Sequence, residues 1–254
     1  MSTLQETITF IGNGNMALSI AHGLKNDYNI EVVGRNLDKL DSFEQKLQSN
    51  ISKALIDNFD ITNKNIIICV KPANLVEIGT KLIGDSNELY SVLAGTTIEK
   101  LQDNIKSKRY VRVMPNLAAT INLSMTTLVG DLELKDKAIK LFSNIGETLW
   151  LDNQKQLDIA TALAGSGPAY LSLIHEAFCD GAVKQGMKRT DAIIVANGLF
   201  KGFGELIGSS HSALLKDSVM SPGGTTAAGY AALEKYGVRY GCISAIEEAF
   251  KITQ

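Results

Sequence analysis

The segment from Val219 to Thr226, Val-Met-Ser-Pro-Gly-Gly-Thr-Thr, has the composition of an anion-binding turn. It leads into a helical pattern, and the first N–H groups of a helix lack partners within that helix, so they are free to bind an anion. Two glycines would let a ligand approach the main chain, and three hydroxyl groups would add hydrogen-bond donors. The alternative is an ordinary cap, because serine and threonine cap many helices. The candidate residues are Ser221, Gly223, Gly224, Thr225 and Thr226.

A second candidate site lies near the start of the chain. Residues Thr7 to Ile11 have the β-branched and aromatic composition of a strand, and a helical pattern begins after Ala17. The sequence between them, Gly-Asn-Gly-Asn-Met-Ala, matches the G-x-G-x-x-G/A turn of dinucleotide-binding proteins. Gly12 would form the tight turn, and Gly14 would admit the pyrophosphate. The predicted cofactor contacts here are Ile11, Gly12, Asn13, Gly14, Asn15 and Met16.

The next apolar run, Ile30 to Gly34, predicts the second strand of this unit, and Arg35 and Asn36 follow it. Enzymes that use NAD usually place an acidic residue here, about 20 residues past the glycines, where it binds the ribose hydroxyls. Because no carboxylate stands at this point and Arg35 could pair with a 2′-phosphate, the sequence favours NADP over NAD. The alternative for Arg35 is a solvated surface charge. Asn36 would also cap a helix over 37–47.

Three further apolar runs continue the pattern of a parallel sheet: 66–70, 89–93 and 110–114. In open α/β sheets, ligands bind outside the carboxyl ends of the strands, so the residues at those ends should line the cofactor cleft. Two more strands, over 125–129 and 147–151, would complete a doubly wound, mostly parallel α/β sheet of the Rossmann type. The predicted contacts are Val70, Lys71, Pro72, Ala94 and Gly95.

The pattern changes near Asp152, after which we find helical spacing and no strand. This predicts two domains, an NAD(P)-binding domain over 1–152 and an all-helical domain over 153–254. Glycines and a proline should interrupt a helix at 164–168, and Thr190 should cap a helix over 191–207. Small residues are dense on these helices, so the helical domain would complete its core with a second subunit.

Composition excludes several classes of function. Of the 254 residues, 45% are hydrophobic and 20% are charged, and the net charge of −2 gives no attraction to nucleic acid or to an anionic membrane. We find no leader segment and no run that approaches the ~18 apolar residues of a membrane span. The three cysteines are far apart, which indicates buried thiols in a reducing compartment. We expect a cytoplasmic protein.

The sequence shows neither the residue pattern of a hydrolase triad nor that of a metal site. The histidines at 22, 175 and 211 lie on separate elements without a nucleophile motif, and no cluster has the spacing of metal ligands. His175 is interpreted as a helix residue with its hydrogen bonds satisfied. Lys71 could be an acid catalyst, a cofactor contact or a surface lysine. The chemistry should therefore come mainly from the cofactor.

Several unlinked segments together resemble one family. The apolar strand and glycine turn over 11–17, Val-Lys-Pro at 70–72, Ala-Gly at 94–95, Val-Met-Pro-Asn at 113–116, Gly-Ser-Gly-Pro-Ala-Tyr at 165–170 and the 221–226 turn occur in the order and spacing of pyrroline-5-carboxylate reductases. The resemblance covers essentially the whole chain. It implies NAD(P)H-dependent reduction of (S)-1-pyrroline-5-carboxylate to L-proline, the last step of proline biosynthesis. It also implies a helical dimerisation domain whose helices interleave with those of a partner, often within a larger ring.

The resemblance also implies roles for individual residues. Thr226 would donate a hydrogen bond to the ring nitrogen of the substrate, and the residues at 223–225 would hold its carboxylate. Asn58 joins the expected cofactor contacts. The family usually has Arg-Asp-Asn-Val-Thr where this chain has Lys-Asp-Ser-Val-Met at 216–220, so Ser218 replaces an asparagine that contacts the cofactor in relatives.

Three other hypotheses remain at this point. A hydroxyacid dehydrogenase would carry a lysine shortly after the interdomain glycine turn, whereas here Lys184 lies far beyond it. An imine reductase is a related possibility. A non-catalytic NADP-sensing dimer would have no need of the second anion pocket that the 221–226 turn predicts.

Overall fold

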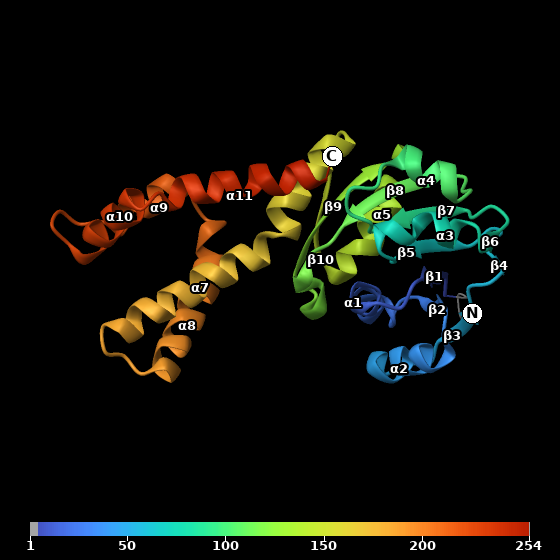
Figure 1. The fold of residues 1–254 in the computed structure, drawn as a ribbon, viewed down its shortest axis with the longest axis horizontal. Helices are drawn as coiled ribbons and strands as arrows, with labels where there is room; N and C mark the ends of the chain where they lie inside the picture. The colour runs from blue at the N-terminus through green and yellow to red at the C-terminus, as the bar shows by residue number, and fades with distance from the viewer. Residues whose placement is uncertain (1–4, 254) are drawn as a thin grey trace. The chain divides into compact units, whose positions relative to one another are not determined.

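The computed structural model describes residues 5–253 and contains a large, mostly parallel sheet covered by helices (Figure 1). Eight strands form this sheet in the order β10-β9-β8-β7-β5-β1-β2-β3, and β4 pairs with β6 in a separate two-stranded sheet. The strands are β1 (Thr7–Ile11), β2 (Asn29–Gly34), β3 (Ser52–Leu55), β4 (Phe59–Asp60), β5 (Asn65–Ile68), β6 (Leu82–Ile83), β7 (Glu88–Ser91), β8 (Tyr110–Met114), β9 (Ser124–Gly130) and β10 (Gly146–Trp150).

The strand order reverses at β1, which confirms the doubly wound fold. The chain builds outward from β1 through β2 to β3, and then returns to the other side of β1 with β5, β7 and β8. All neighbouring pairs in the large sheet are parallel except β8 and β9. In such a sheet the crevice for a ligand opens at the reversal point, beyond the carboxyl ends of the strands on either side of it.

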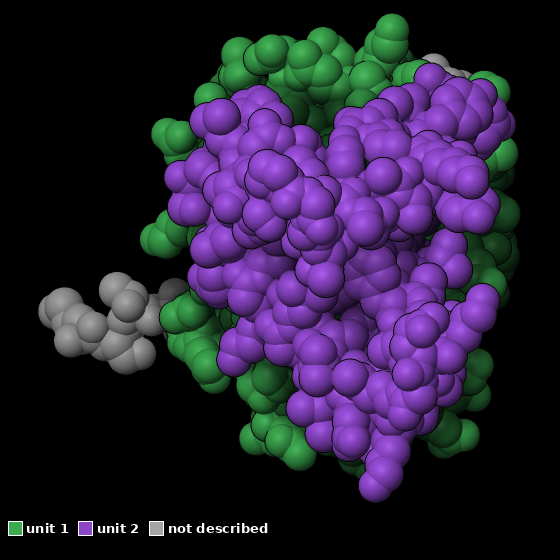
Figure 2. Space-filling model, turned by 90° about the vertical axis from the view of Figure 1, so that its left-hand side faces the viewer, with its two compact units in different colours: residues 1–166, 249–254 green, residues 167–248 purple. Residues whose placement is uncertain are grey.

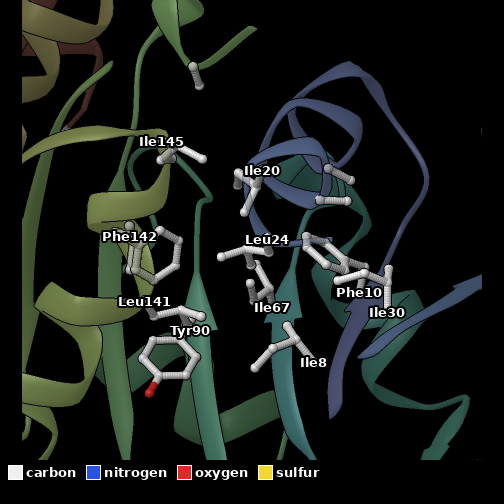
Figure 3. Close-up of a cluster of buried hydrophobic side chains, with 14 of the residues drawn as sticks. Ile8, Phe10, Ile20, Leu24, Ile30, Ile67, Tyr90, Leu141, Phe142 and Ile145 are labelled. Carbon is white, nitrogen blue, oxygen red and sulfur yellow. The ribbon is translucent and has the colours of Figure 1, made fainter. Parts of the chain in front are cut away.

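Each face of the sheet packs against its own set of helices. Alternate strand residues point to opposite faces, so Ile67 of β5 joins one core and Ile66 and Ile68 join the other. The first core is the larger and contains an edge-to-face contact between Tyr90 and Phe142 at 5.7 Å between ring centroids (Figure 3). The helices of the first core are α1 (Asn15–Leu24), α2 (Leu37–Leu47) and α5 (Lys135–Phe142), and those of the second are α3 (Leu75–Gly79) and α4 (Ile98–Asn104).

The helical part of the chain begins with α6 (Gln154–Ala160), which a π-helical turn over Thr161–Gly165 joins to α7 (Gly167–Lys184). The predicted interruption is therefore confirmed, as a change in helix type rather than a loop. Pro168 lies in the first turn of α7, where its missing N–H costs little. The later helices are α8 (Arg189–Ile207), α9 (Ser212–Ser218), α10 (Thr225–Lys235) and α11 (Val238–Ile252).

The prediction that Thr190 caps α8 is wrong. The helix begins at Arg189, two residues before the predicted start at 191, and its N-cap is Lys188. The Thr190 hydroxyl donates to the Asp191 carboxylate at 3.3 Å instead of accepting from the backbone. A threonine already inside the first turn has helical backbone angles, so it cannot act as the cap.

A buried ion pair ties α6 to the sheet. Arg112 of β8 is 1% exposed, and its guanidinium lies 2.6 Å from the Asp158 carboxylate of α6. The guanidinium also donates to the Gln154 side chain at 3.2 Å, and the same amide oxygen accepts from the Ile98 N–H at 2.8 Å. Leu157 is fully buried beside them. These contacts fix α6 against β8 and the start of α4.

The chain divides into two compact units, residues 1–166 with 249–254 and residues 167–248 (Figure 2). The second unit buries little apolar surface, since its buried residues are Cys179, Ala192 and Ala196. The predicted functional boundary at 152/153 lies just before α6 and stays a prediction.

Large apolar side chains on the second unit are open to solvent in the single chain, among them Leu173 at 67% and Ile194 at 70% exposed. Within the described residues, the helical stretch Gln154–Lys184 is long and apolar enough to cross a membrane by length and composition, since it contains an 18-residue window with a mean hydropathy of 1.2. The expectation that no run approaches this length is therefore wrong. We expected all three thiols to be buried, but Cys242 is exposed and Cys69 is only partly buried, and Cys179 alone of the three is buried.

Candidate active site

The glycine turn after β1 has the geometry that a dinucleotide requires. Gly12 has a φ of +109°, and a Cβ there would lie 2.7 Å from the Cys69 carbonyl oxygen, so the turn admits only glycine. Its N–H donates to the Val33 carbonyl at 2.9 Å, which holds the turn against β2. Gly14 is the N-cap of α1 without any side-chain cap, and a Cβ there would meet open space. The first N–H groups of α1 therefore remain available to a pyrophosphate.

A cavity of about 430 Å³ opens beside this turn, at the carboxyl ends of β1, β2 and β5. Its position agrees with the crevice that the strand order predicts. Many of the predicted cofactor residues line it, and Arg35 and Lys71 are the basic members of the lining. The predicted residues in the lining are Ile11, Gly12, Asn13, Gly14, Arg35, Val70 and Lys71.

Further lining residues were not predicted as contacts. Val33 and Gly34 end β2, and Cys69 follows β5. Burial raises the pKa of the Cys69 thiol, so this thiol stays protonated. Apolar Ile56 and Ile78 come from segments whose role in the cavity the sequence does not reveal. They add apolar surface to the lining of the cavity. Asn74 completes the lining.

Other predicted cofactor residues lie near the same edge but outside this lining. The Asn36 side chain accepts from the Lys39 N–H at 3.0 Å, which confirms it as the cap of α2. Asn58 is exposed at a turn and has a φ of +57°. Gly95 has a φ of +62° and approaches Thr253, since a Cβ at Gly95 would lie 3.6 Å from the Thr253 Cα.

The remaining predicted contacts belong to neighbouring surfaces. Asn15 lines a smaller hollow of about 180 Å³ that shares Asn13 and Gly14 with the main cavity. Met16 is partly buried against the first core. Pro72 begins a short 3₁₀ turn after Lys71, and Ala94 is exposed after β7. The assignment of all these residues to the cofactor stays a prediction.

The 221–226 turn leaves its donors free, unlike an ordinary cap. The helix starts at Thr225 with Gly224 as its N-cap, and no side chain caps it. Gly223 has a φ of +72°, and the Gly224 N–H donates to the Ser221 carbonyl at 3.0 Å, which closes the turn. Thr225 and Thr226 are exposed in the first helical turn, and this turn contains no acidic residue. The arrangement can bind a carboxylate through backbone N–H groups and hydroxyls.

His175 is a satisfied helix residue, as interpreted from the sequence. Its ring nitrogen lies 3.0 Å from the Asn197 side-chain oxygen, and its ring packs edge-to-face on Phe200 at 5.2 Å between centroids. Among residues 5–253, no group of three or more histidine, cysteine or acidic side chains could hold a metal ion.

Comparisons with known proteins agree with both parts of the chain. Residues 154–254 match the family model for pyrroline-5-carboxylate reductase dimerisation, and residues 7–93 match that for coenzyme F420-dependent NADP oxidoreductases. The chain is 31% identical to the pyrroline-5-carboxylate reductase of Helicobacter pylori J99 over 97% of its own length and 98% of that protein. The chain belongs to the pyrroline-5-carboxylate reductase family. It is thus an oxidoreductase.

Solved structures of pyrroline-5-carboxylate reductases share the fold. The Streptococcus pyogenes enzyme superposes with a TM-score of 0.88 at 28% identity, covering 99% of each chain. The Plasmodium falciparum enzyme, solved with NADP bound, gives a TM-score of 0.80 at 26% identity and covers 98% of each chain. The cofactor is NADP, and the residues of the glycine turn fit it, because the space beyond Gly14 is open and the N-terminus of α1 is uncapped.

Replacing Gly14 by alanine should separate cofactor binding from folding. The new methyl group enters open space, and the φ of −79° suits alanine, so the free energy of unfolding should fall by no more than about 1 kcal/mol. The methyl group would occupy the approach of the pyrophosphate, so the Kd for NADPH, measured by fluorescence titration, should rise about tenfold or more. Gly12→Ala is the matched variant and should lose both stability and binding. Unchanged NADPH affinity in Gly14→Ala would contradict this geometry.

Proposed function

We infer that this protein reduces (S)-1-pyrroline-5-carboxylate to L-proline with NADPH, the last step of proline biosynthesis. The observation that carries this function is the uncapped 221–226 turn, which can bind the carboxylate of the substrate. The chain that contains this turn belongs to the reductase family, and its glycine turn fits NADP. A dehydrogenase for hydroxyacids lacks support, because the helix after the π-turn reaches Lys184 only at its end.

The reaction adds a hydride to the imine carbon and a proton to the imine nitrogen. The bound cofactor supplies the hydride. In this proposal, the N–H groups of the first turn of α10 and the Ser221 and Thr225 hydroxyls bind the substrate carboxylate. The Thr226 hydroxyl hydrogen-bonds the ring nitrogen, as a donor to the neutral imine or as an acceptor from the protonated one, and orients the carbon toward the hydride. A cyclic imine can carry its own proton near neutral pH, so Thr226 need not be the proton source.

The direct test is oxidation of NADPH by the purified protein, followed at 340 nm with and without pyrroline-5-carboxylate, with proline identified in the product. The assay is then repeated with NADH. Substrate-dependent oxidation that yields proline is the expected result. This function would be rejected if a folded protein binds NADPH but oxidises neither NADPH nor NADH in the presence of pyrroline-5-carboxylate. Another imine substrate or a sensing role would then be favoured.

Arg35 should set the preference for NADPH. It follows β2 at the cavity edge and is 61% exposed, so a 2′-phosphate can reach the guanidinium. We expect Arg35→Ala to lower the ratio of kcat/KM for NADPH over NADH by about tenfold, mainly through the KM for NADPH. The ratio is measured at fixed pyrroline-5-carboxylate. An unchanged ratio would make Arg35 a surface charge without a role in recognition.

Self-association explains the apolar surface of the second unit. A groove of about 610 Å³ lies between α8 and α9, and most of its lining is apolar side chains and two glycines, Gly198 and Gly202, with Ser212 and Lys216 as the polar members. A Cβ at either glycine would meet open space within the chain, so these small residues are free to contact another chain. The family model over this region is one of dimerisation. We propose that the protein self-associates, as a homodimer or as a larger ring, and works in the cytoplasm without membrane or nucleic-acid partners.

A further inference from the structure

A carboxylate that the sequence does not place at the cofactor site lies at the same rim as Arg35. Glu77 belongs to α3 and directly precedes Ile78, which lines the cavity. Its Oε1 lies 4.0 Å from a terminal nitrogen of Arg35. At this distance the attraction is electrostatic and not a hydrogen bond, so a ligand can displace it. The rim therefore carries an acid although none follows β2.

A second cation, Lys81, also pairs with Glu77. The Lys81 ammonium lies 3.5 Å from the same Glu77 oxygen and 3.1 Å from an Asp57 oxygen. The hydrogen bond with Asp57 raises the pKa of Lys81, so its charge is retained. Along the rim, the charges alternate in sign from Arg35 through Glu77 and Lys81 to Asp57. Glu77 is half exposed, so its charge still acts on a neighbouring ligand.

We propose that Glu77 is a second determinant of cofactor choice, which weakens the preference for NADPH that Arg35 creates. The proposal rests on the proposed function, since it requires the 2′ position of the cofactor to lie beside Arg35. A 2′-phosphate there carries negative charge and is repelled by Glu77, whereas a free ribose hydroxyl can donate to a carboxylate. The ion pair with Glu77 also has to be broken before Arg35 can engage the phosphate with its full charge.

Glu77→Gln removes this charge and keeps the shape of the side chain. The probes are 2′,5′-ADP and 5′-AMP, which differ in the 2′-phosphate, and their Kd values are measured by isothermal titration calorimetry. We expect the affinity for 2′,5′-ADP relative to 5′-AMP to rise about fivefold in this variant. The gain should shrink at high salt, because the rim is exposed. The same variant should raise the NADPH-to-NADH ratio of kcat/KM.

Two further variants sharpen the test. Lys81→Met removes the charge that balances Glu77, so it should lower the preference for 2′,5′-ADP. Glu133→Gln is the matched control, because Glu133 also pairs with an arginine, Arg109, but both of these residues line a separate hollow and neither lines the cofactor cavity. It should leave the preference unchanged.

The outcomes separate this proposal from the proposed function. If the natural chain reduces pyrroline-5-carboxylate with NADPH and Glu77→Gln leaves the preference unchanged, or changes it no more than Glu133→Gln does, Glu77 has no role in cofactor choice and the function stands. If the natural chain neither reduces the imine nor binds 2′,5′-ADP, both proposals fall together.

Discussion

Replacing Asp158 by alanine is expected to lower the free energy of unfolding by about 3–5 kcal/mol. The loss comes from the partner, since Arg112 is 1% exposed and would keep its charge in an apolar site without a counter-ion. The neutral Gln154 oxygen would still accept from the guanidinium, but the Nε of Arg112 is a buried donor without a hydrogen-bond partner in the described chain, so the compensation is small. Chemical denaturation followed by circular dichroism measures the change.

A double variant isolates the cause of this loss. Arg112→Met together with Asp158→Leu removes both charges and keeps apolar volume, so it should be much closer to the natural chain in stability than either single variant. A double variant as unstable as Asp158→Ala would show that the pair itself, rather than an uncompensated charge, stabilises α6. An Asp158→Ala variant of natural stability would mean that water reaches Arg112.

The elements next to the glycine turn were predictable because local chemistry fixes them. The strand over 7–11 and the helix over 37–47 have the predicted bounds, since a dense β-branched run and an asparagine cap are local signals. Strand β3 was not predicted. It has the sequence Ser-Lys-Ala-Leu at the edge of the sheet, and exposed edge strands lack the continuous apolar pattern of central ones.

The residues around the cavity could be predicted from the sequence only where they stand at the ends of strands. Residues at strand ends follow from the sheet order, so Gly12, Gly14, Arg35 and Lys71 could be placed together from the sequence. Glu77 could not, because it reaches the rim from a helix whose packing angle the sequence does not specify. A search for an acid directly after β2 finds none, whereas the fold supplies one from α3.

Replacing Thr226 by alanine is expected to lower kcat by about 10²-fold and to leave the Kd for NADPH close to that of the natural chain. Thr226 is exposed in the first turn of α10, and alanine favours helix, so the fold should tolerate the change. Stopped-flow and steady-state rates with pyrroline-5-carboxylate measure the loss. Thr226→Ser keeps a hydroxyl and should restore most of the rate. Equal losses of turnover and NADPH affinity would instead indicate a structural role.

The pH dependence of the Thr226→Ala defect separates two roles for the hydroxyl. If the hydroxyl helps to protonate the imine nitrogen, acid should reduce the defect, because the substrate then arrives already protonated. If the hydroxyl only orients the ring, the variant should lose the same factor at every pH at which the natural chain is active. We expect the second result, because the backbone holds the hydrogen-bond donors of the 221–226 turn in place. The described residues of this turn also include no side chain that titrates near neutral pH.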